Sequence, residues 1–177
     1  MPSLHLALLR GINVGGKNKL PMKELAAIFE KRGCGRVRTF IQSGNVIFTA
    51  APKIVERLST AVAGDIQARF GYRTPVILRT AKQLRDAVAA NPFPGREENL
   101  YVMFLQDRPD QQQIGALDPH RSLPDRFEVR GAEIYLHVIS HLARTKLTNA
   151  WFDSRLETVS TLRNWRTVMK LLEMMEE

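Results

Sequence analysis

The first half of the chain alternates short apolar runs with amphipathic segments. The apolar run over residues 4–9 predicts a buried strand. Hydrophobic residues at helical spacing then predict a helix that begins at Pro21 and ends at Gly33, because proline suits the first helical position and glycine ends helices. A second helix of the same kind runs from Pro52 to Gly71. Three more strands are predicted over residues 36–42, 45–50 and 74–79, and the first two of them form a hairpin through Ser43-Gly44.

The order of these elements predicts the fold class. A strand, helix, strand, strand, helix, strand sequence over residues 1–79 is the split βαβ unit of ferredoxin-like α+β folds with a mixed sheet. In that topology the third strand lies antiparallel between the first two. The end of the first strand and the tip of the hairpin are therefore expected at the same edge of the sheet.

The second half of the chain, residues 80–177, is expected to form a second, smaller α/β half with C-terminal helices. The alternation of predicted strands and helices in this half resembles that of the first half. This suggests a duplicated unit, although no residue-level repeat is evident. The patterns predict helices over 80–90, 111–117 and 146–156, a strand over 99–106, a hairpin of 127–130 with 133–137, and a helical last segment through Met174.

Charge is distributed unevenly along the chain, whose net charge is +8. Residues 1–80 carry 13 Lys and Arg against 4 Asp and Glu, whereas residues 81–177 carry 13 against 14. A basic first half attracts anions and nucleic acid; solubility, or an arginine-rich codon bias, is the competing explanation. Cys34 is the only cysteine, which fits a reducing cytoplasm and a structural role in a turn. No segment is long and apolar enough to suggest a membrane span.

The loop Gly11–Lys19, which follows the first predicted strand, is the most function-like segment. Its first eight residues, GINVGGKN, match the G-x-x-x-x-G-K part of a phosphate-binding loop. The match fails at Asn18, where a hydroxyl would be needed to bind magnesium. Pro21 also delays the following helix, because the residue before a proline avoids helical dihedrals. We therefore reject a nucleoside triphosphatase.

A more general anion site at this edge remains the favoured interpretation. Ligands commonly bind between the carboxyl end of a strand and the following helix. The competing interpretation is a glycine-rich turn with solvated lysines. The end of the second helix, with Arg69, Tyr72 and Arg73, is expected nearby. The predicted ligand-binding residues are Arg10, Asn13, Gly15, Gly16, Lys17, Lys19, Gln42, Ser43 and Asn45.

Several motifs of the chain resemble a bacterial family catalogued as domain of unknown function 1697. They are LLRGINVGGKN at residues 8–18, IQSGNV at 41–46, and KLTN at 146–149 with RNW at 163–165. The resemblance covers nearly the full chain and implies a two-part α/β fold with ferredoxin-like character, but no established activity. Leu162 and Arg166 depart from the family pattern. The C-terminal segment adds four further candidate site residues: Lys146, Asn149, Arg163 and Asn164.

The sequence favours binding over any particular chemistry. We expect a phosphorylated or nucleotide-like anion at the loop edge. One alternative is a nucleic-acid-binding module that uses the basic half, with Phe40 and Phe48 available for stacking; the other is a non-catalytic assembly module. His137 and His141 have metal-ligand spacing only on one helix, and His137 is expected to end a strand, so no metal site is predicted. The sequence does not specify an enzymatic activity, a cofactor or an oligomeric state.

Overall fold

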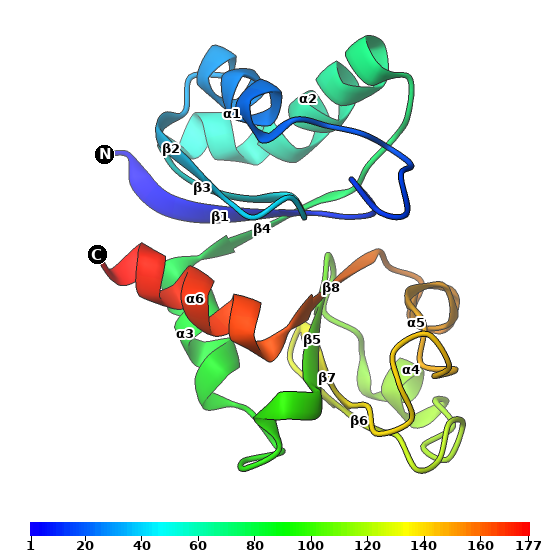
Figure 1. The fold of residues 1–177 in the computed structure, drawn as a ribbon. Helices are drawn as coiled ribbons and strands as arrows, with labels where there is room; N and C mark the ends of the chain where they lie inside the picture. Colours follow the sequence, from blue (N-terminus) through cyan, green and yellow to red (C-terminus); the bar gives the residue numbers. More distant parts are fainter. The chain divides into compact units, whose positions relative to one another are not determined.

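Each half of the chain builds a four-stranded sheet in the computed structural model, which describes all residues from Met1 to Glu177 (Figure 1). Unit 1 comprises Met1–Leu84 together with Met175–Glu177, and unit 2 comprises Arg85–Met174. The two units are of nearly equal length.

Unit 1 has the predicted ferredoxin-like topology. Its strands lie in the order β2-β3-β1-β4, and every neighbouring pair is antiparallel. β3 therefore lies between β1 and β2, which run parallel to each other, as the sequence predicts. The elements are β1 (Ser3–Leu9), α1 (Met22–Lys31), β2 (Gly35–Phe40), β3 (Asn45–Ala50), α2 (Pro52–Phe70) and β4 (Val76–Thr80), followed by α3 (Ala81–Ala89).

The core of unit 1 lies between the sheet and the two helices α1 and α2. Alternate side chains of β1 and β3 face these helices, because successive residues of a strand point to opposite sides. Each fully buried Leu or Phe contributes about 1.5–3 kcal/mol through the hydrophobic effect. The core includes Ala7, Leu9, Val46, Phe48, Leu25, Phe29, Leu58, Val62 and Ile66.

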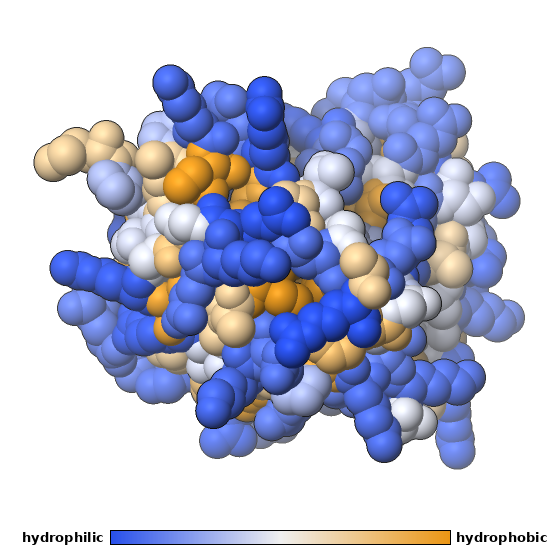
Figure 2. All heavy atoms as spheres, turned by 90° about the horizontal axis from the view of Figure 1, so that it is seen from above, coloured by the Kyte–Doolittle hydropathy of each residue, from blue (hydrophilic) through white to orange (hydrophobic).

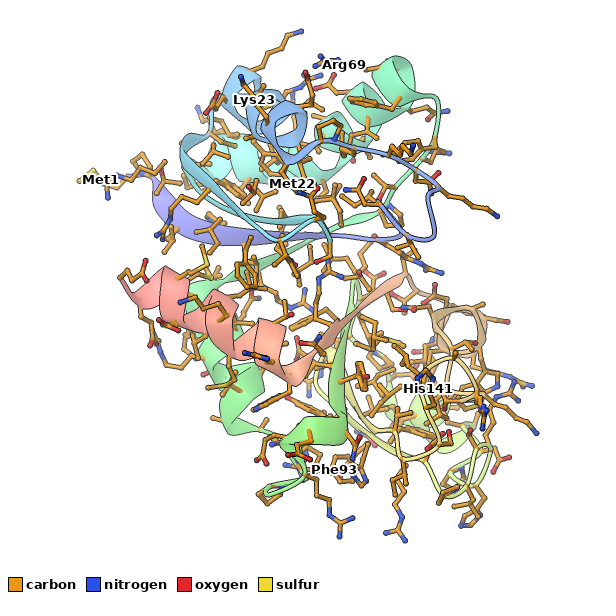
Figure 3. The ribbon with its side chains drawn as sticks, in the orientation of Figure 1. Met1, Met22, Lys23, Arg69, Phe93 and His141 are labelled. Carbon is orange, nitrogen blue, oxygen red and sulfur yellow. The ribbon has the colours of Figure 1, made fainter.

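The face of the molecule that carries α1 and α2 is mainly hydrophilic, with scattered apolar atoms (Figure 2). Lys23 and Arg69 extend from these helices away from the sheet (Figure 3). Arg69 pairs with Glu24, and Arg32 binds both carboxylate oxygens of Asp65 at 2.5 and 2.6 Å. This face thus balances part of its positive charge internally.

Unit 2 repeats the topology of unit 1. Its sheet has the order β6-β7-β5-β8, again entirely antiparallel, and its helices α4 and α5 occupy the places of α1 and α2 along the chain. No helix in either unit has the length and apolarity needed to cross a bilayer. The elements are the short 3-10 helix η1 (Glu97–Asn99), β5 (Leu100–Leu105), α4 (Gln111–Gly115), β6 (Arg126–Arg130), β7 (Glu133–His137), α5 (Asn149–Leu156), β8 (Ser160–Asn164) and α6 (Trp165–Glu176).

The prediction of helix throughout the last segment is wrong, because Ser160–Asn164 is a strand that pairs with β5. Leu162 lies on this strand. The buried hydrophobic residues of α6 are Val168, Leu171, Leu172 and Met175, while Met169 is exposed. Five residues are too few for the two-residue period of a strand to stand out beside a long amphipathic helix.

A residue-level repeat links the last strands of the two units. Leu78-Arg79-Thr80 ends β4 and Leu162-Arg163-Asn164 ends β8. In each triplet the arginine is buried and donates to the carbonyl of the preceding leucine, at 3.0 Å and 2.8 Å respectively. The third residue then caps the next helix, since Gln83 N donates to Thr80 Oγ1 and Thr167 N to Asn164 Oδ1.

Candidate anion-binding edge

The predicted site residues of unit 1 come together where β1 ends. The loop Gly11–Lys19 emerges there beside the β2–β3 turn, and the end of α2 lies at the same end of the sheet (Figure 1). The amide of Leu9 donates to the carbonyl of Gly44 at 2.9 Å, and Asn13 Nδ2 donates to the carbonyl of Gln42 at 2.8 Å. Three segments that are distant in sequence therefore form one edge, which we call the loop edge: residues 10–20, 41–45 and 71–74.

The two glycines of the loop serve a tight hairpin. Lys17 N donates to the carbonyl of Val14 at 2.9 Å, and the two residues form an isolated antiparallel bridge. Gly15 and Gly16 between them have φ values of 56° and 75°. Positive φ at both central positions defines a type I′ turn, for which Gly-Gly is favoured. The loop is thus a projecting hairpin, which is unlike the backbone of a nucleoside triphosphatase loop.

Asn13 holds the base of this hairpin. Its Oδ1 accepts from Leu20 N at 2.8 Å, and its Nδ2 donates to the carbonyls of Leu20 and Gln42 at 2.9 and 2.8 Å. Its φ is 54°, a conformation that asparagine tolerates better than most residues. The side-chain amide is therefore committed to the loop's own backbone, so Asn13 positions the edge.

Asn18 and the residues that follow α2 also hold the backbone of the loop in place. Asn18 Nδ2 donates to the carbonyl of Gly11 at 2.9 Å, and Tyr72 Oη donates to the carbonyl of Asn18 at 3.0 Å. Thr74 Oγ1 donates to the carbonyl of Arg10 at 2.6 Å. Burial raises the pKa of Tyr72, so its hydroxyl stays a donor over the physiological range. These contacts fix the path of the loop before any ligand arrives.

The β2–β3 turn is held in the same way. Asn45 is fully buried, and its Nδ2 donates to the carbonyl of Phe40 at 3.0 Å and to Ser43 Oγ at 2.8 Å. Gly44 has a φ of 79°, and a Cβ at this position would lie 2.7 Å from Leu9 Cβ. Gly44 is thus required by the close approach of the turn to β1.

Three cations of the loop edge lack internal counter-ions. Lys17, Lys19 and Arg73 are exposed and make no ion pair. All four acidic residues among residues 1–80 lie on the helices α1 and α2, so none lies on the loop edge. Two ion pairs therefore balance part of the positive charge near the helices, whereas no acidic residue stands among the cations of the loop edge.

Two apolar side chains accompany these cations. Val14 is 64% exposed and Ile41 is 50% exposed, and each adjoins a residue of the Asn13–Gln42 contact. Ile41 also has a φ of 49°, which is unusual for a β-branched residue and costs free energy. An exposed, strained isoleucine beside cations gives the loop edge an apolar as well as an electrostatic component.

The four further candidates, Lys146, Asn149, Arg163 and Asn164, all belong to unit 2. Asn149 Nδ2 donates to the fully buried Ser160 Oγ at 2.8 Å, and Asn164 caps α6. Arg163 is buried, which lowers its pKa to about 10. Lys146 is exposed. In unit 2, Asn149 and Asn164 therefore have structural contacts of their own.

Several other candidates have structural roles. Cys34 is buried, and burial raises the pKa of its thiol to about 11, which removes it as a nucleophile at neutral pH. Phe48 is fully buried in the core and is not available to stack a base, whereas Phe40 is half-buried. No group of three or more His, Cys, Asp or Glu side chains is arranged to hold a metal ion.

Sequence reasoning missed the scaffold residues Asn18 and Thr74 and the exposed apolar pair Val14 and Ile41. The signal for Asn18 is the symmetric placing of two asparagines around the hairpin, since asparagine favours both positive φ and side-chain bonds to the backbone. No sequence signal distinguishes the exposed Ile41 from the buried isoleucines of the neighbouring strand.

Comparison with known proteins agrees with the motifs quoted above. Residues 3–135 match the model of the protein family described as "Protein of unknown function (DUF1697)". The chain belongs to this family. The family match spans the loop edge and includes all nine site residues proposed in unit 1. No curated protein matches the chain.

A solved structure has a similar architecture. The conserved bacterial protein SP0830 from Streptococcus pneumoniae is 21% identical to this chain, with full coverage of both chains and a TM-score of 0.73. At this identity the likeness concerns the fold alone.

Proposed function

We propose that this DUF1697 protein binds a phosphorylated or nucleotide-like anion at the loop edge. The observation that carries the proposal is the set of exposed cations Lys17, Lys19 and Arg73, which have no acidic partner; all four acidic residues among residues 1–80 lie on the helices α1 and α2. Exposed cations of this kind concentrate anions and accelerate their association.

The rigidity of the scaffold supports the same proposal. Side-chain bonds from Asn13, Asn18 and Tyr72 hold the hairpin in one conformation, so little ordering entropy is lost when a ligand binds. Val14 and Ile41 offer apolar surface beside the cations. A ligand with a flat apolar part and phosphate groups fits this combination better than a simple inorganic ion. We include a cytoplasmic location in the proposal, because the single buried thiol suits a reducing compartment.

The test compares matched lysine substitutions. Binding of a fluorescently labelled nucleoside triphosphate is measured by anisotropy for the parent protein, for the Lys17→Ala, Lys19→Ala double variant and for Lys53→Ala. Lys53 is exposed at the start of α2, at the opposite end of the sheet, and controls for loss of charge alone. We expect the double variant to lose about tenfold or more in affinity, because charge-assisted contacts are worth about 1.5–3 kcal/mol each. Equal losses in the Lys53→Ala protein would remove the loop edge from the site.

A single-stranded nucleic acid is the second candidate, favoured by the projecting and exposed form of the hairpin. A polyanion that contacts several cations releases counterions, so its affinity falls steeply with salt. The same proteins are titrated with a labelled oligonucleotide at several salt concentrations. If the magnitude of the salt slope decreases by about 1.4 in the double variant but not in Lys53→Ala, the result supports nucleic acid. Saturable, weakly salt-dependent binding of the triphosphate alone supports the small ligand.

A further inference from the structure

Three of the seven exposed large hydrophobic residues of the chain lie on two neighbouring loops of unit 2. Leu123 is 60% exposed, Ile139 53% and Leu142 40%. The first loop leads into β6 and the second follows β7; residues 119–126 and 138–148 together are called the Leu123 surface below. Single exposed apolar side chains are common, but several on adjoining segments with a polar rim mark an interaction surface.

Hydrogen bonds hold the two loops side by side. Asp125 Oδ1 accepts from the backbone amide of Ile139 at 2.8 Å. Ser122 Oγ accepts from the backbone amide of Lys146 at 2.9 Å. Leu123 lies between these two points of attachment in the sequence, so its exposed side chain emerges beside the second loop.

The second loop keeps a strained conformation. His141, which Figure 3 shows in this part of unit 2, has a φ of 108°, a value that residues other than glycine rarely adopt. Its carbonyl accepts from the amides of Arg144 and Thr145 at 2.9 and 3.1 Å, which keeps the turn closed. Strain of this kind persists only where surrounding contacts enforce it, and it is concentrated at functional segments.

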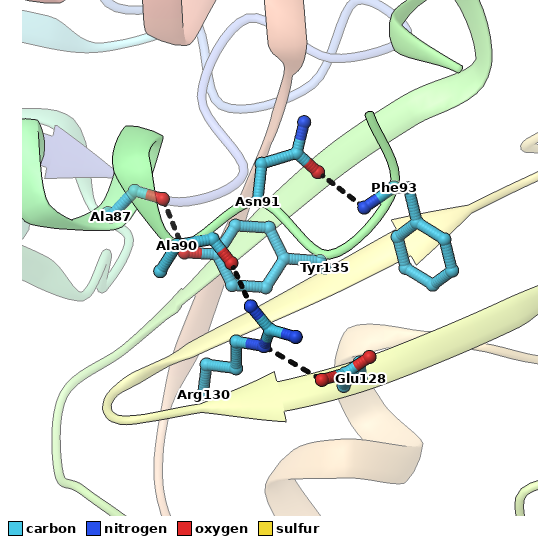
Figure 4. A network of polar contacts seen from close by, with 7 residues as sticks. All are labelled: Ala87, Ala90, Asn91, Phe93, Glu128, Arg130 and Tyr135. Atoms are coloured by element: carbon cyan, nitrogen blue, oxygen red, sulfur yellow. Dashed lines mark hydrogen bonds and ion pairs between the residues drawn. The ribbon is translucent and has the colours of Figure 1, made fainter. Parts of the chain in front are cut away.

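The strands that carry these loops are anchored as well (Figure 4). Tyr135 on β7 donates to the carbonyl of Ala87. Arg130 on β6 donates to the carbonyl of Ala90 and to the carboxylate of Glu128. The loops therefore extend from a fixed hairpin, and little ordering entropy is lost when their side chains bind a partner.

The charge of the Leu123 surface is strongly positive. Its only acid, Asp125, is buried and accepts hydrogen bonds from the backbone of the second loop. No acidic side chain forms an ion pair with its cations, and all of them except Arg121 are exposed. These cations are Arg121, Arg126, Arg144 and Lys146.

This composition favours one class of partner. Single-stranded nucleic acid is bound by aromatic side chains that stack on bases, whereas the exposed apolar residues here are aliphatic. A second copy would bring like charges together across a symmetric interface, which is unfavourable. Protein interfaces draw much of their binding energy from buried aromatic side chains, and leucine is under-represented among those residues. Aliphatic side chains beside several cations suit the acyl boundary and negative headgroups of an anionic lipid surface.

We propose that the Leu123 surface binds the surface of an anionic membrane. Leu123, Ile139 and Leu142 enter the boundary between headgroups and acyl chains, and the neighbouring cations pair with lipid phosphates. Binding is peripheral and reversible, because three aliphatic side chains bury far less apolar surface than a spanning helix. The surface is independent of the loop edge, because every residue that forms it belongs to unit 2.

Vesicle sedimentation tests the requirement for charge. The full-length protein is mixed with vesicles of phosphatidylcholine alone, or of an equimolar mixture of phosphatidylcholine and phosphatidylglycerol. We expect binding to the mixture only, and weaker binding as salt is raised. The Arg144→Gln, Lys146→Gln double variant should bind about thirtyfold more weakly, since each basic residue near an anionic leaflet contributes about fivefold. The matched control is Arg108→Gln, Arg155→Gln, which removes two exposed arginines of unit 2 outside the Leu123 surface and should retain most of the binding.

A tryptophan reporter tests insertion. In Leu142→Trp, the emission that remains after subtraction of the parent spectrum should shift to shorter wavelength with anionic vesicles, and lipids with brominated acyl chains should quench it. Met169→Trp, at an exposed position of α6, is the control and should show neither effect. The Leu123→Ser, Leu142→Ser double variant should bind about tenfold more weakly than the parent. Its circular dichroism should match the parent, because both side chains are exposed.

The proposal fails if the parent protein binds neither kind of vesicle, or binds phosphatidylcholine alone equally well. It also fails if Met169→Trp responds like Leu142→Trp. Loss of vesicle binding in the Lys17→Ala, Lys19→Ala protein alone would place the lipid contact on the loop edge instead. Self-association without vesicle binding, if the Leu123→Ser, Leu142→Ser change abolishes it, would assign the surface to a second copy of the chain.

Discussion

The side-chain amide of Asn13 donates to the carbonyl of Gln42 at 2.8 Å and so joins the glycine-rich loop to the β2–β3 turn, 29 residues farther along the chain. Together with the hydrogen bond from Leu9 N to the carbonyl of Gly44, this contact holds a hairpin that carries lysines beside a second polar turn. The loop edge depends on it more than on the glycines, because Gly15 and Gly16 act only within their own turn.

Replacing Asn13 should therefore destabilise unit 1 more than replacing Asn18. Asn13→Ala removes three hydrogen bonds and places alanine at a φ of 54°, which predicts a loss of about 2–4 kcal/mol in the free energy of unfolding. Asn18→Ala also places alanine at a positive φ, of 51°, but it removes only one side-chain bond, to Gly11, and should cost about 1–2 kcal/mol. Urea denaturation followed by circular dichroism ranks the two, and equal losses would contradict the assigned role of Asn13.

Two glycines with the same backbone conformation should respond differently to alanine. Gly44 and Gly71 have φ values of 79° and 80°. A Cβ on Gly44 would lie 2.7 Å from Leu9 Cβ and 2.8 Å from Ile12 Cδ1, whereas a Cβ on Gly71 meets nothing within 4 Å. Gly71→Ala should cost about 1–2 kcal/mol from backbone strain alone, and Gly44→Ala about 1–3 kcal/mol more from overpacking. Thermal unfolding of the pair separates the two effects, and equal shifts in Tm would mean that the turn relaxes away from β1.

The fold of unit 1 could be predicted from the sequence, because the residues that mark helix ends agree with the topology that the order of elements implies. Pro21 and Gly71 mark helix boundaries, and the split βαβ rule then brings the end of β1 next to the β2–β3 turn. The strand Ser160–Asn164 was missed because a five-residue strand directly followed by an amphipathic helix carries almost no periodicity of its own.

The roles of the site residues were harder to predict than their positions. The sequence places Asn13 and Asn45 at the edge, but whether an amide faces a ligand or its own backbone depends on carbonyl groups that only the folded chain brings near. No sequence motif predicts that His137 Nδ1 is buried without a hydrogen-bond partner, or that Phe93 stacks on its ring.

The thiol of Cys34 should be nearly unreactive in the native protein. Burial raises its pKa to about 11, so the thiolate population at pH 8 is about 100-fold below that of an ordinary cysteine. Alkylation by iodoacetamide, followed by mass spectrometry, should be at least that much slower in the native protein than in urea. The native rate should rise about tenfold for each pH unit between 8 and 10. A native rate equal to that of the unfolded protein would mean that the turn around Cys34 opens readily.

Asp125 should make the stability of unit 2 depend on pH in the acid range. It is 1% exposed; Oδ1 accepts from the backbone amides of Ile139 and Ser140 at 2.8 and 2.9 Å, and Oδ2 accepts from Ser140 Oγ at 2.5 Å. Burial by itself raises the pKa of Asp125, but the hydrogen bonds from Ser140 and its neighbours outweigh burial and lower it below the usual range. The stabilisation from this carboxylate is therefore fully present above the ordinary aspartate pKa and is lost as the pH falls through the lower value of the folded state.

Asp125→Asn tests this directly. Hydrogen bonds to a charged group are worth about 1.5–3 kcal/mol, so at pH 7 the variant should lose about that much stability in urea denaturation. The difference from the parent protein should shrink as the pH is lowered toward 3, because the parent then loses the charge that the variant never had. Glu98→Gln is the matched control, since Glu98 is exposed and makes no hydrogen bond or ion pair; it should show neither effect. A difference between Asp125→Asn and the parent that stays constant from pH 7 to pH 3 would show that the shape of the side chain matters at this position and its charge does not.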